Sequence, residues 1–145
     1  MKVLLLIPHT LTPDRHAAVR AGERPQTDYD ALAEAVRAMP GGQADILDRS
    51  SVGKDGGWLV RLTHRLLGID WALALLGFLH CRRYDTVLTH SEALGLPLSV
   101  LFILLWRRPR HVTTAYYLVG KRNALWYRLL RAHNRIDKIF VPPCD

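Results

Sequence analysis

The sequence has few cysteines, no long apolar run and few acidic residues in its second half. Cys81 and Cys144 lack the paired spacing of a zinc site and are too few for a disulfide framework. The longest uncharged stretch ends at Trp106, contains Pro97 and is shorter than the roughly 20 residues of a membrane-spanning helix. These absences exclude a disulfide-stapled miniprotein and predict a chain without a transmembrane segment.

The length and the apolar content predict one globular domain. The chain has 145 residues, of which 49% are hydrophobic, so we expect residues 1–145 to form a single domain with an ordinary core. Residues 2–8 carry one positive charge and no small-residue cleavage site, which indicates a buried strand rather than a secretory signal. With reduced cysteines, this predicts a cytoplasmic location, with or without membrane association.

Positive charge is concentrated in the second half of the chain. Residues 1–72 are balanced, whereas residues 73–145 hold eleven basic and four acidic residues and therefore the whole net charge of +7. This asymmetry indicates an anionic partner, and a solvated face or an acidic neighbouring domain is the alternative. Nucleic acid is disfavoured because no recognised binding motif is present and no aromatic side chains interleave with the arginines.

The candidate membrane- or phosphate-contacting residues form two groups. Three lie beside the apolar stretch that ends at Trp106, and five form a basic stripe within and next to an expected amphipathic helix: Arg107, Arg108 and Arg110, then Lys121, Arg122, Arg128, Arg131 and Arg135. A basic stripe opposite apolar side chains fits docking on an anionic membrane surface, and a solvated helix face also explains it. The three arginines beside the apolar stretch favour the membrane.

Short apolar runs alternate with helical stretches. Strands are expected at residues 3–8, 44–47, 85–89, 111–115 and 138–141, and helices at residues 28–39, 58–79, 93–106 and 123–134. We expect a break near Gly68, a loop at residues 49–57 and Pro97 in the first turn of its helix. The alternation predicts an α/β fold, a Rossmann-like three-layer domain with a mostly parallel sheet of at least five strands.

Ligands of such sheets bind beyond the carboxyl ends of the strands. That rule selects polar and aromatic residues after four expected strands: His9 and Thr10, residues 48–51, His90, Ser91 and Glu92, and Tyr116 and Tyr117. Ser91 and Glu92 also suit the cap and first turn of the next helix, whereas His90 ends a buried strand and faces the expected crevice.

Several catalytic motifs are absent. No glycine-rich dinucleotide fingerprint follows the first strand, and Asp55 stands where a phosphate loop needs serine or threonine. The seven histidines show no zinc-binding spacing, and Ser91 lacks the glycines of a nucleophile elbow. We therefore expect no cofactor and no metal, and assign no catalytic residue.

Four segments carry a resemblance to a known family. Residues 2–8 (KVLLLIP), 84–91 (YDTVLTHS), 111–115 (HVTTA) and 137–141 (DKIFV) resemble the N-terminal half of GT-B-fold glycosyltransferases, nearest to family 4, group 1. The glycine-rich loop of that family is loosely matched at Gly22. The histidine that the family commonly carries after its Val-Thr-Thr strand is replaced here by residues 115–117 (AYY).

The resemblance implies that two Rossmann-like domains face each other. The N-terminal one binds a sugar or lipid-linked acceptor, the C-terminal one binds the nucleotide sugar, and catalysis is generally independent of metal. This chain would be the acceptor half, without its donor-binding domain, and inactive unless a partner domain or subunit completes it. The alternative is a non-catalytic module of the same fold that docks on a membrane or a partner.

Overall fold

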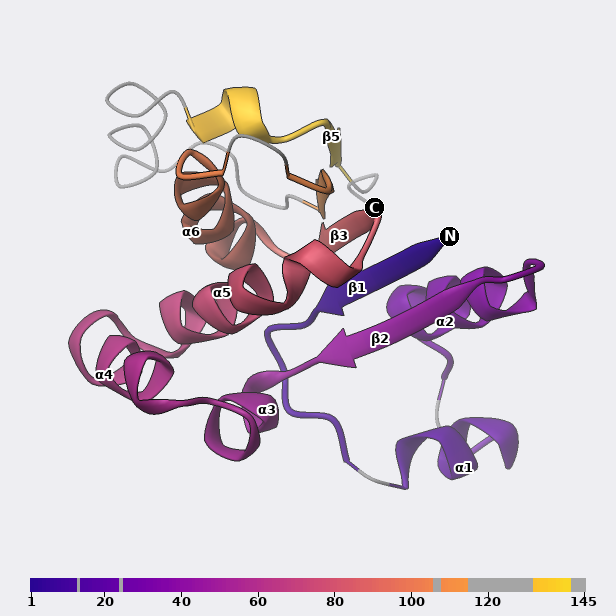
Figure 1. Cartoon of the computed structure of the whole chain (residues 1–145). Helices are drawn as coiled ribbons and strands as arrows, with labels where there is room; N and C mark the ends of the chain where they lie inside the picture. The colour runs from indigo at the N-terminus through magenta and orange to yellow at the C-terminus, as the bar shows by residue number, and fades with distance from the viewer. Residues whose placement is uncertain (13, 24, 106–107, 115–131, 142–145) are drawn as a thin grey trace.

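The sheet is parallel throughout (Figure 1). The computed structural model describes residues 1–12, 14–23, 25–105, 108–114 and 132–141. Five strands lie side by side in the order β2-β1-β3-β4-β5. They are β1 Lys2–Leu6, β2 Gln43–Leu47, β3 Thr86–Thr89, β4 Arg110–Thr114 and β5 Lys138–Phe140. The chain is therefore an α/β protein with a Rossmann-like sheet, as the alternation of apolar runs predicts.

Strand β1 is deeply buried. Leu4, Leu5 and Leu6 have at most 1% of their surface exposed. They are covered because β1 pairs with β2 on one side and β3 on the other, while helices pack above and below. A strand covered on both faces has a continuous apolar sequence, and this pattern predicted β1 correctly.

Helices cover both faces of the sheet and give three layers. The described helices are α1 Arg15–Arg20, α2 Asp28–Ala38, α3 Arg49–Lys54, α4 Trp58–Leu67, α5 Ile69–His80 and α6 Glu92–Phe102, with 3-10 turns η1 Cys81–Arg83 and η2 Ala132–Arg135. Helix α2 packs against Val3 and Leu5 on one face, and α5 and α6 share a core with Leu4 and Leu6 on the other. Neighbouring β1 side chains thus serve two separate cores, because successive residues of a strand point to opposite faces.

Residues 49–57, expected as a loop, begin with helix α3. The Asp48 Oδ1 atom caps this helix by accepting hydrogen bonds from the Ser51 backbone N–H at 3.1 Å and from its hydroxyl at 3.0 Å. Serine and glycine in this stretch are typical of a loop, but a capping carboxylate is enough to start a short helix. The expectation of a loop is wrong for Arg49–Lys54.

Two details of the long helical regions depend on glycine and proline. Helices α4 and α5 meet at Gly68, where a backbone φ of 94° favours glycine, so the expected break is confirmed. Pro97 lies inside α6 and not in its first turn, because this helix begins at Glu92. The helix ends at Phe102, several residues earlier than its apolar sequence suggests.

Candidate functional site

The carboxyl ends of β1 and β3 form the topological switch point of the sheet. From β1 the chain first moves outward to β2 and then crosses back to β3, so the following helices lie on opposite faces. The three strand ends are level, because the Ile7 N–H donates to the Leu47 carbonyl at 2.9 Å and the His90 N–H donates to the Leu6 carbonyl at 3.0 Å. A crevice at this point is the usual ligand site of an open α/β sheet.

His90 stands at this switch point, half-buried. Its ring meets the Tyr29 ring edge-on, with centroids 5.3 Å apart and an interplanar angle of 74°. Burial lowers the pKa of His90 below its ordinary value, the charge of Asp28 opposes that shift, and the charge of His9 adds to it. His90 is therefore neutral near pH 7 and suited to accept a hydrogen bond or a proton.

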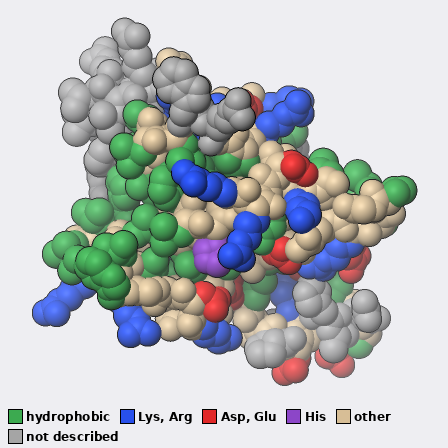
Figure 2. Space-filling view, viewed as in Figure 1, with side chains coloured by type: hydrophobic (Ala, Val, Ile, Leu, Met, Phe, Trp, Pro, Cys, Tyr) green, Lys and Arg blue, Asp and Glu red, His purple; other side chains and the backbone are tan. Residues whose placement is uncertain are grey.

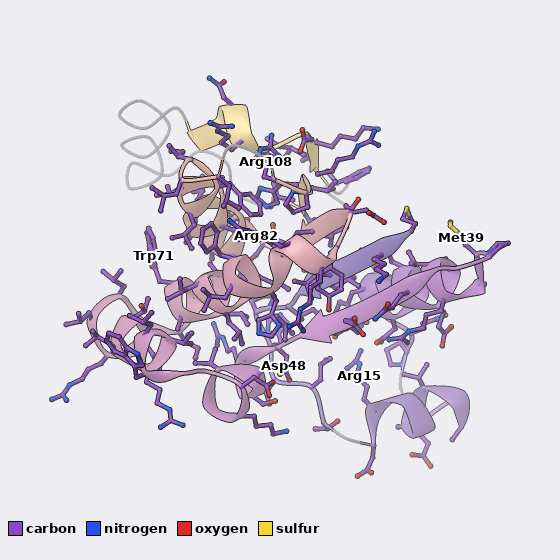
Figure 3. All side chains as sticks on the ribbon, in the orientation of Figure 1. Arg15, Met39, Asp48, Trp71, Arg82 and Arg108 are labelled. Atoms are coloured by element: carbon purple, nitrogen blue, oxygen red, sulfur yellow. The ribbon has the colours of Figure 1, made fainter. Side chains whose placement is uncertain are left out.

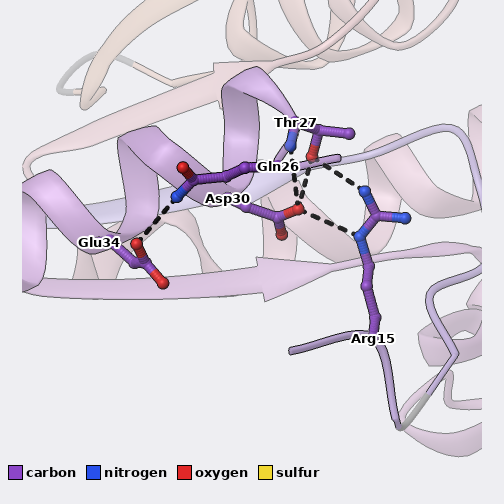
Figure 4. Close-up of polar contacts among 5 residues, drawn as sticks. All are labelled: Arg15, Gln26, Thr27, Asp30 and Glu34. Atoms are coloured by element: carbon purple, nitrogen blue, oxygen red, sulfur yellow. Dashed lines mark hydrogen bonds and ion pairs between the residues drawn. The ribbon is translucent and has the colours of Figure 1, made fainter. Parts of the chain in front are cut away.

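The segment after β1 is fastened to α2 beside this site (Figure 4). Arg15 Nε lies 3.1 Å from Asp30 Oδ2, and Arg15 Nη2 donates to the Thr27 hydroxyl at 3.2 Å. The Thr27 hydroxyl in turn donates to Asp30 Oδ2 at 2.6 Å. The Arg15 guanidinium also lies 5.3 Å from the centre of the Tyr29 ring. These contacts hold the side chain that packs against His90.

Asp30 is a buried carboxylate that this network keeps ionised. Only 2% of the residue is exposed. Burial alone would raise its pKa, but hydrogen bonds from Thr27 and Arg15 and the charge of Arg15 bring the pKa below its ordinary value. Its second oxygen, Oδ1, is buried without a hydrogen-bond partner in the part of the chain that the structure describes. Asp30 depends on Arg15 for its only described ion pair.

Asp48, expected as a crevice residue, is occupied by structural contacts. Its Oδ1 caps α3 and also accepts from the Ser50 hydroxyl at 2.7 Å, while Oδ2 accepts from the Leu11 N–H at 2.7 Å. Burial raises the pKa of Asp48, yet these hydrogen bonds outweigh burial and lower it. Asp48 therefore ties the segment after β1 to the end of β2, and its oxygens are already engaged.

A second polar group lies beneath the beginning of α6. The Thr89 hydroxyl donates to the Thr113 hydroxyl at 2.9 Å and lies 3.3 Å from His111 Nε2. The Ser91 Oγ atom is buried and has no hydrogen-bond partner among residues 1–12, 14–23, 25–105, 108–114 and 132–141. Ser91 occupies the expected N-cap position of α6, but its side chain makes no capping hydrogen bond.

His111 is enclosed between this group and Phe102. Its ring centroid lies 5.4 Å from that of Phe102, nearly perpendicular, and none of the residue is exposed. Burial lowers the pKa of His111 to about 4, and the nearby charge of Arg108 acts in the same direction. His111 is thus a neutral core residue rather than part of the crevice.

The structure brings together only some of the expected site residues. His9 and Thr10 are exposed after β1, and half-buried His90, Ser91 and Glu92 follow β3 at the same edge. Tyr116 and Tyr117 lie outside the described residues. Sequence reasoning missed Arg15, Asp30 and the contact of Tyr29 with His90. The one signal available was the polar start of the helix at residues 27–30.

Of the expected basic contacts, the three that the structure describes, Arg108, Arg110 and Arg135, lie away from the carboxyl ends of β1 and β3. Arg107, Lys121, Arg122, Arg128 and Arg131 lie outside the described residues, and Arg135 is half-buried in η2. Arg110 is exposed at the start of β4. Arg108 pairs with Asp137, with Nη1 2.6 Å from Oδ2 and Nη2 3.3 Å from Oδ1.

Arg108 also lines a groove at the amino ends of β3 and β4. Its volume is about 870 Å³, and its walls are Arg82, Tyr84, Asp85, Leu104, Leu105, Arg108 and Pro109. Figure 3 shows Arg82 and Arg108 well away from Asp48 at the end of β2. The groove is therefore separate from the residues at the carboxyl ends of β1 and β3.

Searches of the described residues for a metal site and a membrane-spanning helix, and of known proteins for a similar one, found none. In the part of the chain that the structure describes, no cluster of three histidine, cysteine or acidic residues is placed to hold a metal ion. Within the same residues, no helix combines the length and the apolar character needed to cross a bilayer. Comparison of the chain with models of known families, with curated proteins and with solved structures finds no match.

Proposed function

We propose that this chain is the acceptor-binding half of a glycosyltransferase, and that the crevice at the carboxyl ends of β1 and β3 holds a hydroxyl group of a sugar or lipid-linked acceptor. The observation that carries the proposal is the half-buried His90 at the switch point, whose pKa is held below its ordinary value. A neutral imidazole accepts a hydrogen bond or a proton from a hydroxyl, as the acceptor of a sugar requires. The resemblance of four segments to GT-B enzymes supports the same function.

Glycosyl transfer requires a donor and an acceptor held together with water excluded. The proposal assigns the acceptor to residues 1–145 and the nucleotide sugar to a second Rossmann-like domain or subunit. We therefore expect the purified chain to transfer no sugar from a nucleotide sugar by itself. Transfer by this chain alone would contradict the division of roles.

Calorimetric titration tests acceptor binding directly. The probes are methyl glycosides of glucose, galactose, mannose and N-acetylglucosamine. We expect at least one to bind, and His90→Ala to weaken that binding about tenfold, the size of one lost hydrogen bond. His64→Ala, which removes an exposed imidazole on α4, is the matched control and leaves the affinity unchanged. Absence of binding, or equal affinities for the two variants, contradicts the proposal.

A non-catalytic module that docks on a membrane or a partner is the second candidate. The exposed apolar side chains of α4 favour it, since Trp58 is 73% and Leu66 is 71% exposed. Co-purification of a Rossmann-like subunit would support sugar transfer. Vesicle binding without any such subunit and without glycoside binding would support the docking module.

A further inference from the structure

Helix α4 presents most of its apolar side chains to solvent. Trp58, Leu62 and Leu66 are 73%, 45% and 71% exposed, and their spacing of four residues places them in one stripe, the α4 stripe. Val60, on the opposite side of the helix, is fully buried. A helix on the surface of a water-soluble domain normally has the reverse arrangement, with its apolar stripe facing the core. An exposed stripe of this kind marks an interaction surface.

Positive charge flanks the α4 stripe on one side. Arg61 and Arg65 each lie three residues after a member of the stripe, and α4 contains no acidic residue. The nearest acidic residues in sequence are Asp55 before the helix and Asp70 after it. Asp70 is paired with Arg49 at 3.2 Å, so its charge is already neutralised. Figure 2 shows hydrophobic side chains gathered over this part of the molecule, with lysine or arginine side chains at their rim.

We propose that α4 docks on the surface of an anionic lipid bilayer, with Trp58, Leu62 and Leu66 below the headgroups and Arg61 and Arg65 against the lipid phosphates. Tryptophan and leucine suit the boundary between headgroups and acyl chains, and arginine reaches the phosphates from an apolar stem. Ten residues make a helix about 15 Å long, which lies along a bilayer surface and does not cross it.

A bilayer fits these observations better than a protein partner does. The apolar and the basic side chains occupy adjacent arcs of one helix, which matches the layered order of acyl chain and phosphate in a leaflet. Arg61 and Arg65 are not among the basic residues expected from the sequence, of which Arg108 is paired with Asp137.

Docking through α4 would also orient the domain. Helix α4 lies toward the end of the sheet to which the strands point, the end that carries the His90 crevice (Figure 1). A lipid-linked acceptor held in the bilayer would then meet the crevice from the membrane side. The docking uses none of the crevice residues, so a failure of vesicle binding and a failure of glycoside binding are separate results.

Co-sedimentation of the full chain with vesicles tests the docking. The vesicles are phosphatidylcholine alone, or phosphatidylcholine with phosphatidylglycerol at about 7 to 3. We expect binding to the anionic vesicles, and at least about tenfold weaker partitioning after Trp58→Ser, Leu62→Ser and Leu66→Ser are combined. Because all three side chains are exposed and none belongs to the buried core, this variant should keep the circular dichroism spectrum and thermal midpoint of the parent.

A charge-matched pair of variants separates location from net charge. Arg61→Ala with Arg65→Ala should weaken binding to anionic vesicles about tenfold. Arg82→Ala with Arg83→Ala removes the same charge from exposed residues of η1 and should bind as the parent does. Equal losses in the two double variants would contradict docking through α4.

Trp58 supplies a direct signal even if the triple variant fails to fold. Brominated lipids in the anionic vesicles should quench the tryptophan fluorescence of the parent, and Trp58→Phe should remove most of that quenching. Quenching unchanged in Trp58→Phe, or no vesicle binding by the parent, overturns the proposal. So does a dimer in sedimentation equilibrium that Leu66→Ser dissociates, because the α4 stripe would then be covered by a second copy.

Discussion

Arg15 and Asp30 form an ion pair across the turn that separates α1 from α2. The arginine Nε lies 3.1 Å from Asp30 Oδ2, with side-chain exposures of 16% and 2%. This pair joins the segment after β1 to the helix that carries Tyr29, which packs on His90. The geometry of the candidate crevice therefore depends on a contact that is not itself part of it.

Removing the charge of Arg15 should destabilise the folded chain. Arg15→Met leaves Asp30 buried without its charge partner, and we expect a loss of about 2–3 kcal/mol in the free energy of unfolding, somewhat below the range for fully buried pairs. Asp30→Asn in the same chain should recover part of that loss, because the buried charge is then gone. Urea denaturation measures both. A loss of less than about 0.5 kcal/mol for Arg15→Met would show that the pair is not structural.

Acid should destabilise the chain through its paired carboxylates. Asp30, Asp48 and Asp137 all have a pKa below the ordinary value of 3.8, because hydrogen bonds outweigh burial. A lowered folded-state pKa contributes stability that is complete above the unfolded-state pKa and is lost as pH falls through the folded-state pKa. The urea midpoint should therefore drop steeply below about pH 4, and Asp48→Asn should make that drop shallower.

His111 should produce a separate drop at higher pH. Its pKa is about 4 in the folded chain against an ordinary 6.5, so between these values the unfolded chain binds a proton that the folded chain excludes. Stability should fall by about 3 kcal/mol as the pH decreases from 6.5 to 4. His111→Gln should flatten this part of the profile, while His64→Gln, on an exposed residue, should leave it unchanged. Parallel profiles for parent and His111→Gln would refute the assignment.

The close approach of α6 to the sheet can be tested at Gly95. A Cβ atom at this position would collide with the Thr113 hydroxyl and stand 3.0 Å from that of Thr89. We expect Gly95→Ala to cost about 1–3 kcal/mol, and the added change Thr113→Ala to recover part of it. Gly53→Ala is the control, because a Cβ there meets nothing within 4 Å and alanine favours a helix. Equal stability of the two alanine variants would contradict the packing described.

The strands were predictable because their information is local. An unbroken apolar run identifies β1, and alternation of runs with helical stretches gives a parallel sheet with His90 at a strand end. The contact of Tyr29 with His90 was not predictable, since it joins residues far apart in sequence through the path of the chain. The pairing of Arg15 with Asp30 was not predictable for the same reason.

The sequence also did not predict which side of a helix faces the core, or where helix α3 begins. The sequence around Trp58 indicates an apolar helix but does not say which of its side chains are buried. Which arc of α4 faces the core is decided by how α5 packs beside it, and the structure buries Val60 and leaves Trp58 exposed. Helix α3 was missed because its start depends on the Asp48 side chain rather than on helix-forming residues.

Nuclear magnetic resonance of the imidazole groups would test most directly whether an acceptor hydroxyl meets His90. The nitrogen resonances of ¹⁵N-labelled chain are followed while the methyl glycosides are added. We expect the signals of His90 to move and those of exposed His64 and enclosed His111 to stay in place. If the glycosides shift no histidine, or shift His64 as much as His90, the sheet does not use its switch point to hold a sugar.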